Sequence, residues 1–307
     1  MTIINLEGDG IYPQLIVLFR AVAYLGKVEI DELKSICYPG AITDKSVSDR
    51  FRGVLSNWID LGLFVENNKQ IELHPKFVKN RGESIDSFTD RLPSFCRQLI
   101  FEPQNCIPLW PEGGGLTEEG VGRTADFVRG MAWALAQDIY NFPTVSAKAI
   151  LDLDLEQRTA GKFIFLNETR PHGLRFWARY LGFATGEGAF FQIDPTLAIR
   201  GELASIFGAR KELSASDFLN SLCVNLPVLD FGRYRQEVES HLNQTAWRKP
   251  AGGHISMSLS LALRRLDLDN IIKLEGKADT GSSFRLTGKN YRTWMGFESV
   301  ILNRGRL

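Results

Sequence analysis

Residues 55–63 (LSNWIDLGL) and residues 174–183 (LRFWARYLGF) contain related sequence motifs, and this repetition is the main evidence for the fold. Each motif sets a tryptophan on a helical stretch that ends at Leu-Gly, where glycine supports the left-handed turn that terminates a helix. Extended residues follow each copy, and a proline, Pro75 or Pro195, leaves the second extended stretch. The second copy has one additional residue between Trp and Leu-Gly. The repetition predicts at least two structural units of the same kind.

The first of these units covers residues 1–80. Apolar residues at helical spacing predict helices over 12–25 and 30–37, and a third helix that Thr43 or Asp44 caps. The spacing of the apolar residues then changes from that of a helix to that of extended strands, on both sides of a run of turn residues. This pattern predicts a β-hairpin. Three short helices do not enclose a core alone, so the hairpin covers their open edge. This order of elements predicts a winged helix.

Two further units follow the same order. In the last one, strands over 271–275 and 283–286 flank the turn signal Asp279-Thr280-Gly281, which predicts that they pair as a hairpin. The fold class is therefore mainly α with small β-hairpins (α+β), built as tandem winged-helix-like units. The predicted parts are an N-terminal winged helix (1–80), a connecting segment (81–122), a middle winged-helix-like unit (123–205), a C-terminal winged helix (206–290) and a basic tail (291–307).

Composition excludes several classes of protein. Lys+Arg and Asp+Glu both total 36, so a surface that wraps nucleic acid or coats an anionic membrane over its whole area is excluded. The longest strongly apolar run, 15–19, is far shorter than the roughly 20 residues of a membrane helix. The first residues are acidic where a secretory signal is basic, so we expect a cytoplasmic protein without membrane contact. The four cysteines are widely spaced and are expected to be buried free thiols.

Candidate catalytic motifs are weak. The glycine-rich loop 113–123 lacks the lysine of a phosphate-binding loop and carries two glutamates, so a flexible linker is favoured. Asp269, Glu275 and Lys277 imitate the acid, acid-x-lysine order of metal-dependent nucleases, but they fall on a hairpin that offers no walled cavity. We therefore expect no catalytic residues, no metal, no small-molecule cofactor and no enzymatic activity.

Basic residues point instead to local contact with nucleic acid. The exposed face of the third helix carries cations, a later helix carries arginines at helical spacing, and the C-terminal end combines cations with Tyr291, Trp294 and Phe297. Cations bind phosphates, and aromatic rings stack on bases. A solvated helix face and a packed terminal element remain alternatives. The candidate nucleic-acid-binding residues are Lys45, Arg50, Arg170, Arg175, Arg179, Arg285, Lys289 and Arg292.

The residues at both ends of the chain resemble those of the DpdG family. The resemblance rests on residues 3–10 (IINLEGDG), 55–64 (LSNWIDLGLF) and 261–266 (LALRRL), the last followed by extended residues. Proteins of this family are encoded with bacterial systems that insert 7-deazaguanine bases into DNA and use them in DNA restriction. The resemblance implies a non-enzymatic subunit of a DNA restriction or anti-phage complex, and it supplies no catalytic residues.

Three functional hypotheses follow. The first is an adaptor that joins larger, catalytic protein subunits and helps to place them on DNA. The second is a transcriptional regulator whose Arg175 and Arg179 helix reads the major groove, which requires a dimer with regularly spaced half-sites. The third is a nuclease that uses Asp269, Glu275 and Lys277.

Overall fold

The first unit contains three helices and a small sheet. The computed structural model describes residues 3–4, 12–39, 44–144, 146–276 and 283–306. Asp44 caps the third helix by accepting a 2.8 Å hydrogen bond from the Ser46 N–H. A short additional strand lies between the first two helices, and the antiparallel sheet has the order β1-β3-β2. The elements are α1 (Tyr12–Leu25), β1 (Val28–Glu29), α2 (Ile30–Cys37), α3 (Lys45–Asp60), β2 (Phe64–Asn67) and β3 (Gln70–Leu73).

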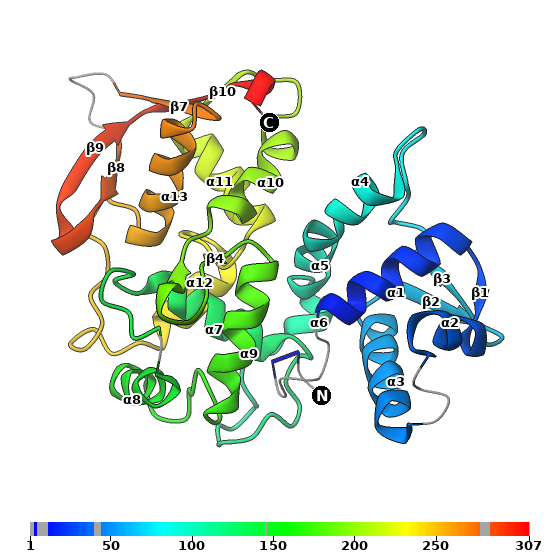
Figure 1. Cartoon of the computed structure of the whole chain (residues 1–307). Helices are drawn as coiled ribbons and strands as arrows, with labels where there is room; N and C mark the ends of the chain where they lie inside the picture. The colour runs from blue at the N-terminus through cyan, green and yellow to red at the C-terminus, as the bar shows by residue number, and fades with distance from the viewer. Residues whose placement is uncertain (1–2, 5–11, 40–43, 145, 277–282, 307) are drawn as a thin grey trace.

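The connecting segment is packed against the units on both sides. It forms α4 (Ile85–Asp90), α5 (Leu92–Ile100) and α6 (Pro103–Cys106), which lie between the blue N-terminal unit and the rest of the molecule (Figure 1). The loop 107–124 has no helix or strand, as expected, but it is no flexible linker. Leu109 and Trp110 are buried, and the Trp110 indole N–H donates to the Phe163 carbonyl at 2.7 Å.

The middle unit is centred on a helix that is buried on every side. All residues of α7 (Ala125–Ala136) are buried, and α7 packs against helices on several sides. The other elements are α8 (Ala147–Gln157), α9 (Thr169–Tyr180), β4 (Ala184–Thr185), the 3-10 helix η2 (Gly188–Phe190) and β5 (Gln192–Ile193).

The third unit repeats the topology of the first over a longer stretch of chain. Its sheet has the order β6-β10-β7, antiparallel throughout, which matches β1-β3-β2 in the first unit. A helix that the sequence did not predict, α10, opens it as α1 opens the first. The elements are α10 (Thr196–Phe207), β6 (Glu212–Ser214), α11 (Ala215–Asn225), α12 (Arg233–Ser240), α13 (Met257–Leu268), β7 (Ile272–Glu275), β8 (Phe284–Thr287), η3 (Lys289–Tyr291), β9 (Thr293–Phe297), β10 (Ser299–Leu302) and η4 (Arg304–Arg306).

The predicted strand pairing in this unit is wrong. Strand β7 pairs with β10, and β8 pairs with β9, so the two strands predicted as one hairpin belong to different sheets. The turn signal at 279–281 lies outside the described residues. Residues 293–302, expected within a basic tail, form two strands, and β10 lies at the centre of the three-stranded sheet. Local turn residues do not specify a partner strand so far along the chain. The fold class, mainly α with small antiparallel sheets, is confirmed.

The two repeated motifs have the same turn geometry. Gly62 (φ +89°) and Gly182 (φ +81°) both lie in the left-handed region, and the Trp58 and Trp177 rings meet with centroids 5.8 Å apart. The carbonyl oxygen of the leucine before each glycine also accepts a hydrogen bond from a side chain of the connecting segment. The Asn105 amide donates to the Leu61 carbonyl at 3.2 Å, and the Arg97 guanidinium donates to the Leu181 carbonyl at 3.1 Å. The connecting segment therefore joins the two repeats at equivalent atoms.

The third unit contains the same turn without glycine. After α13, Asn270 adopts φ +56°, and the Ile271 N–H donates to the Leu266 carbonyl at 2.9 Å. The Leu63 N–H makes the same bond to the Trp58 carbonyl at 2.8 Å. Asparagine tolerates the left-handed region better than other side chains, so this copy carries no Leu-Gly signal.

Candidate nucleic-acid interface

The β8–β9 ribbon lies at the edge of the molecule opposite the N-terminal unit (Figure 1). The ribbon and the loop packed against it carry exposed basic and aromatic residues. Tyr291 and Trp294 are 37% and 41% exposed, which is high for such large rings. The Arg248 guanidinium lies 4.0 Å from the centroid of the Tyr291 ring in a cation–π contact. We call this surface the basic ribbon. It consists of Arg248, Arg285, Lys289, Tyr291, Arg292 and Trp294, and all six residues are exposed.

The turn of the ribbon positions the two rings. Asn290 and Tyr291 have φ of +58° and +59°, as the central residues of a tight hairpin turn do. The Gly288 N–H donates to the Arg292 carbonyl at 2.7 Å. A Cβ atom on Gly288 would lie 1.8 Å from the indole nitrogen of Trp294, so only glycine lets the indole lie against this backbone. The turn therefore needs glycine for space.

Contacts at the base of the ribbon hold it against the preceding loop. The Arg285 N–H donates to the Gly253 carbonyl at 2.8 Å, and the Ile255 N–H donates to the Arg285 carbonyl at 3.0 Å. The His254 Nε2 atom lies 2.9 Å from the Thr293 hydroxyl. Partial burial, with a smaller effect of Asp138, raises the pKa of Tyr291, so its ring is neutral at physiological pH. The ribbon thus presents its cations and rings from an anchored backbone.

Of the predicted residues, Arg285, Lys289 and Arg292 are exposed on this ribbon. Arg248 was missed, because it lies in the loop between α12 and α13 and no motif surrounds it. A lone arginine more than thirty-five positions before the hairpin gives no sequence signal, and only the tertiary structure brings it over Tyr291.

The exposed face of α3 is less suited to a polyanion. Lys45 and Arg50 are exposed, as expected, but Asp49 is exposed on the same helix and Asp44 occupies its N-terminus. Hydrogen bonds from Ser46 lower the pKa of Asp44, so it is negatively charged at neutral pH. A phosphate that approaches this face meets charges of both signs.

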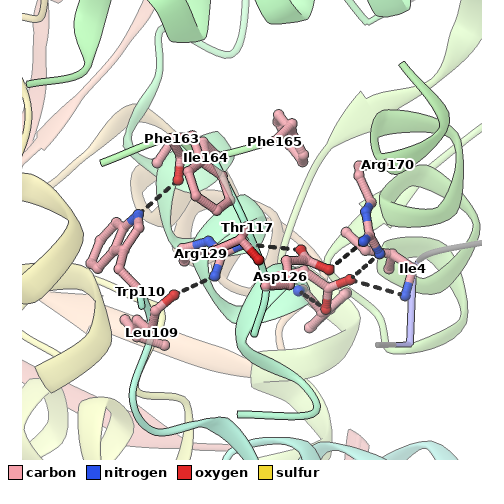
Figure 2. A network of polar contacts seen from close by, with 12 residues as sticks. Ile4, Leu109, Trp110, Thr117, Asp126, Arg129, Phe163, Ile164, Phe165 and Arg170 are labelled. Atoms are coloured by element: carbon pink, nitrogen blue, oxygen red, sulfur yellow. Dashed lines mark hydrogen bonds and ion pairs between the residues drawn. The ribbon is translucent and has the colours of Figure 1, made fainter. Parts of the chain in front are cut away.

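Arg170 is buried, which corrects the expectation that it lies on an exposed helix face. Its side chain is 3% exposed and forms ion pairs with two carboxylates, Asp126 at 2.9 Å and Glu118. Asp126 also accepts a 3.4 Å hydrogen bond from the Ile4 N–H. Figure 2 shows Arg170, Asp126 and Ile4 converging in this way. The arginine joins α9, α7 and the loop 107–124, and it is not available to DNA in this structure.

A second buried arginine extends this network. Arg129 on α7 is fully buried, contacts Glu118 at 3.3 Å, and donates to the Leu109 carbonyl (Figure 2). Its guanidinium lies 4.8 Å from the centroid of the Phe163 ring. Burial lowers the pKa of Arg129, although the neighbouring carboxylates oppose this shift. The glycine-rich loop therefore uses Glu118 to pair with two arginines, which is a structural role.

The two remaining arginines of α9 have local partners. Arg175 is half-buried, donates to the Thr144 carbonyl at 2.8 Å, and lies 2.5 Å from His172 Nδ1. Arg179 forms an ion pair with Glu187. These contacts hold both side chains against the middle unit.

The residues that resemble a nuclease do not form a site among the described residues. Asp269 is exposed at the end of α13, and Glu275 pairs with Lys273 at 2.6 Å. Lys277 lies outside the described residues. In the part of the chain that the structure describes, no group of three or more His, Cys, Asp or Glu side chains is arranged to hold a metal. Cys96 and Cys106 are buried free thiols, as expected, whereas Cys37 and Cys223 are half-buried.

The fold and this surface define a largely helical protein of small helix-and-sheet units that carries one localised basic ribbon. The chain belongs to the DpdG-like family, whose model matches residues 1–280. The family places the chain in a 7-deazaguanine DNA modification and defence system of several subunits. No curated protein and no solved structure matches the chain. Within the described ranges, the model contains no helix with the length and apolar character needed to span a bilayer.

Proposed function

We propose that the chain is a non-catalytic winged-helix adaptor subunit of a DNA-targeting bacterial defence or restriction complex. It bridges larger protein subunits and contacts DNA through the basic ribbon. The observation that carries the DNA contact is the ribbon itself, four cations and two exposed rings on a chain whose formal net charge is zero. Such a surface binds phosphates and stacks on bases without requiring a basic protein.

The topology of the units supports the winged-helix assignment. Helices α10, α11 and α13 of the third unit correspond to α1, α2 and α3 of the first, and α12 is an additional helix. Both units have the same sheet order, in which the strand after the last helix is at one edge and the short early strand is at the other. A winged helix that reads DNA leaves its third helix exposed. In the third unit the helix that corresponds to α3 is α13, which is largely buried, and Arg265 on it pairs with Asp194.

This burial supports an adaptor more than a groove reader. The third helix of the middle unit, α9, is also packed, and its arginines are engaged within the protein. We therefore assign the middle and third units to structure and protein contact, and the ribbon to DNA. Sequence-specific reading by Arg175 and Arg179, as a transcriptional regulator requires, finds no support in this arrangement.

Salt-dependent binding of the full chain to a labelled duplex tests the DNA contact. The logarithm of the binding constant falls with the logarithm of salt concentration by about 0.9 for each phosphate contact. Replacing Lys289→Gln and Arg292→Gln together is expected to reduce that slope by about 2 and to weaken binding to all sequences alike. The matched control, Lys27→Gln with Arg81→Gln, removes two exposed cations elsewhere and should leave the slope unchanged.

Two results would contradict the proposal. An unchanged slope in the ribbon variant would remove the DNA contact from the ribbon. Tight, sequence-specific binding by a dimer of the wild-type chain at physiological salt, lost on Arg175→Glu and Arg179→Glu, would favour the regulator.

A further inference from the structure

A pocket of about 300 Å³ opens beside the basic ribbon, between α12 with the residues before it, the loop 249–254 and β8. This volume is at the small end of the range for ligand sites, which suits a ligand of the size of one nucleobase. The loop that lines the pocket is the one that pairs with Arg285 of the ribbon. The pocket therefore lies beside the base of the ribbon.

Two aromatic rings form one side of the pocket. Phe231 and Phe284 both line it, and their ring centroids are 5.8 Å apart at an interplanar angle of 64°. Phe231 is 42% exposed. An exposed ring at the mouth of a small pocket provides a face on which a planar base stacks.

The backbone is strained to place the Phe231 ring there. Phe231 has φ +66°, a conformation that bulky residues rarely adopt. The Gln236 amide donates to the Phe231 carbonyl at 2.9 Å, and the next residue, Gly232, is so close to the Pro227 carbonyl that a Cβ atom would lie 2.4 Å from it. Strain of this kind persists where the surroundings enforce it, and it occurs often at ligand sites.

The polar side of the pocket offers hydrogen-bond acceptors. Arg235, 1% exposed, donates to one oxygen of Glu239 at 2.5 Å and holds that carboxylate in place. Glu239 Oε2 and the side-chain amide oxygen of Gln236 (Oε1) make no hydrogen bond within the described ranges, where Glu239 bonds through Oε1 and Gln236 through its amide nitrogen. Asp230, which also lines the pocket, is already bound by the N–H and hydroxyl of Ser256 at 2.5 and 2.6 Å.

Two neighbouring acceptors select a particular base edge. Guanine carries two adjacent N–H donors on its Watson–Crick edge, at N1 and N2, whereas adenine, cytosine and thymine each have only one donor group there. Lys249, which also lines the pocket, supplies a donor for the guanine O6 atom. Enzymes that bind extruded bases use this combination of stacking and hydrogen bonds to the pairing edge.

We propose that this pocket binds a single unpaired guanine-type base of a DNA strand held on the basic ribbon. The proposal rests on the proposed function, because the ribbon supplies the contact to the strand. The pocket reads the pairing edge of the base, and the ribbon binds the phosphates around it.

Binding of the full chain to three labelled duplexes tests the proposal. The duplexes are identical except that one is fully paired, one carries a single bulged guanine, and one carries a single bulged adenine. Since the phosphates are nearly the same, the ribbon contributes equally to all three. We expect the guanine bulge to bind at least tenfold more tightly than the adenine bulge.

Two variants locate the preference. Glu239→Gln keeps an oxygen that accepts from Arg235 but presents an amide donor to the base, so the guanine preference should disappear. Phe231→Leu should weaken both bulged duplexes. Both variants should bind the paired duplex as the wild type does, which also shows that they are folded.

The outcomes separate this proposal from the one above. Equal affinity for the two bulges, or a preference that survives Glu239→Gln, would overturn the base pocket while leaving the ribbon intact. If no duplex binds, the DNA contact fails, and calorimetric titration with dGMP and dAMP then decides the pocket. Preferential binding of dGMP that Glu239→Gln removes would support it, and no such binding would refute it.

Discussion

Replacing Arg170 tests whether this residue stabilises the fold or contacts DNA. Arg170→Met keeps much of the aliphatic length but removes the guanidinium that forms ion pairs with Asp126 and Glu118. Both carboxylates then lose a positive partner, and Asp126 is almost fully inaccessible to solvent. Arg129 remains beside Glu118 at 3.3 Å and also feels the charge of Asp126, so one buried guanidinium is left for two carboxylates.

The expected loss follows from the burial of this pair. Removing one partner of a buried ion pair costs about 3–5 kcal/mol, because the other charge stays in a medium that solvates it poorly. A loss of that size lowers the melting temperature by about 5–8 °C in a chain of this length. Arg170→Lys keeps the charge but cannot reach two carboxylates at once, so we expect a smaller loss of about 1–3 kcal/mol.

Thermal unfolding followed by circular dichroism measures this loss, with Arg292→Met as the control because Arg292 is exposed. The control should change the melting temperature little and weaken DNA binding, whereas Arg170→Met should do the reverse at temperatures where it is folded. High salt should not remove the difference, because buried pairs are weakly screened. A loss below about 1 kcal/mol, or weaker DNA binding by the folded Arg170→Met protein, would refute the structural role.

Three further predictions concern a ribbon turn, a buried acid and the repeated motif. Gly288→Ala should displace the Trp294 indole and weaken duplex binding by about tenfold, measured by fluorescence anisotropy, without changing the melting temperature of the rest of the chain. Burial raises the pKa of Asp154 from 3.8 to about 6, so the folded state holds its proton more tightly than the unfolded chain does. This contribution to the free energy of unfolding is complete below pH 3.8 and is lost as the pH rises through 6, a change of about 3 kcal/mol. Urea unfolding from pH 4 to 7 measures this change. The Asp154→Asn variant should not show it. Gly182→Ala should destabilise more than Gly62→Ala, because both have positive φ but only at Gly182 does the new Cβ atom meet backbone, at 2.7 Å; equal melting temperatures would contradict this.

Much of the helical part of the fold could be predicted from sequence. The bounds of α1 and α2 agree with the apolar spacing, and Asp44, which caps α3, was one of the two cap candidates. These features depend on neighbours within a few residues. Three of the candidate nucleic-acid-binding residues, Arg285, Lys289 and Arg292, are exposed on the ribbon, and their contact with DNA stays a prediction.

Local interactions along the chain account for the helices, the Leu-Gly turns and the repetition that relates the first two units. Long-range packing accounts for the pairing of the strands, the burial of Arg170 between two carboxylates and the position of Arg248 over Tyr291. The physical reason is distance along the chain. A helix or a turn is stabilised by hydrogen bonds between near neighbours, whereas a buried charge or a strand partner depends on residues that become neighbours only when the whole chain has packed.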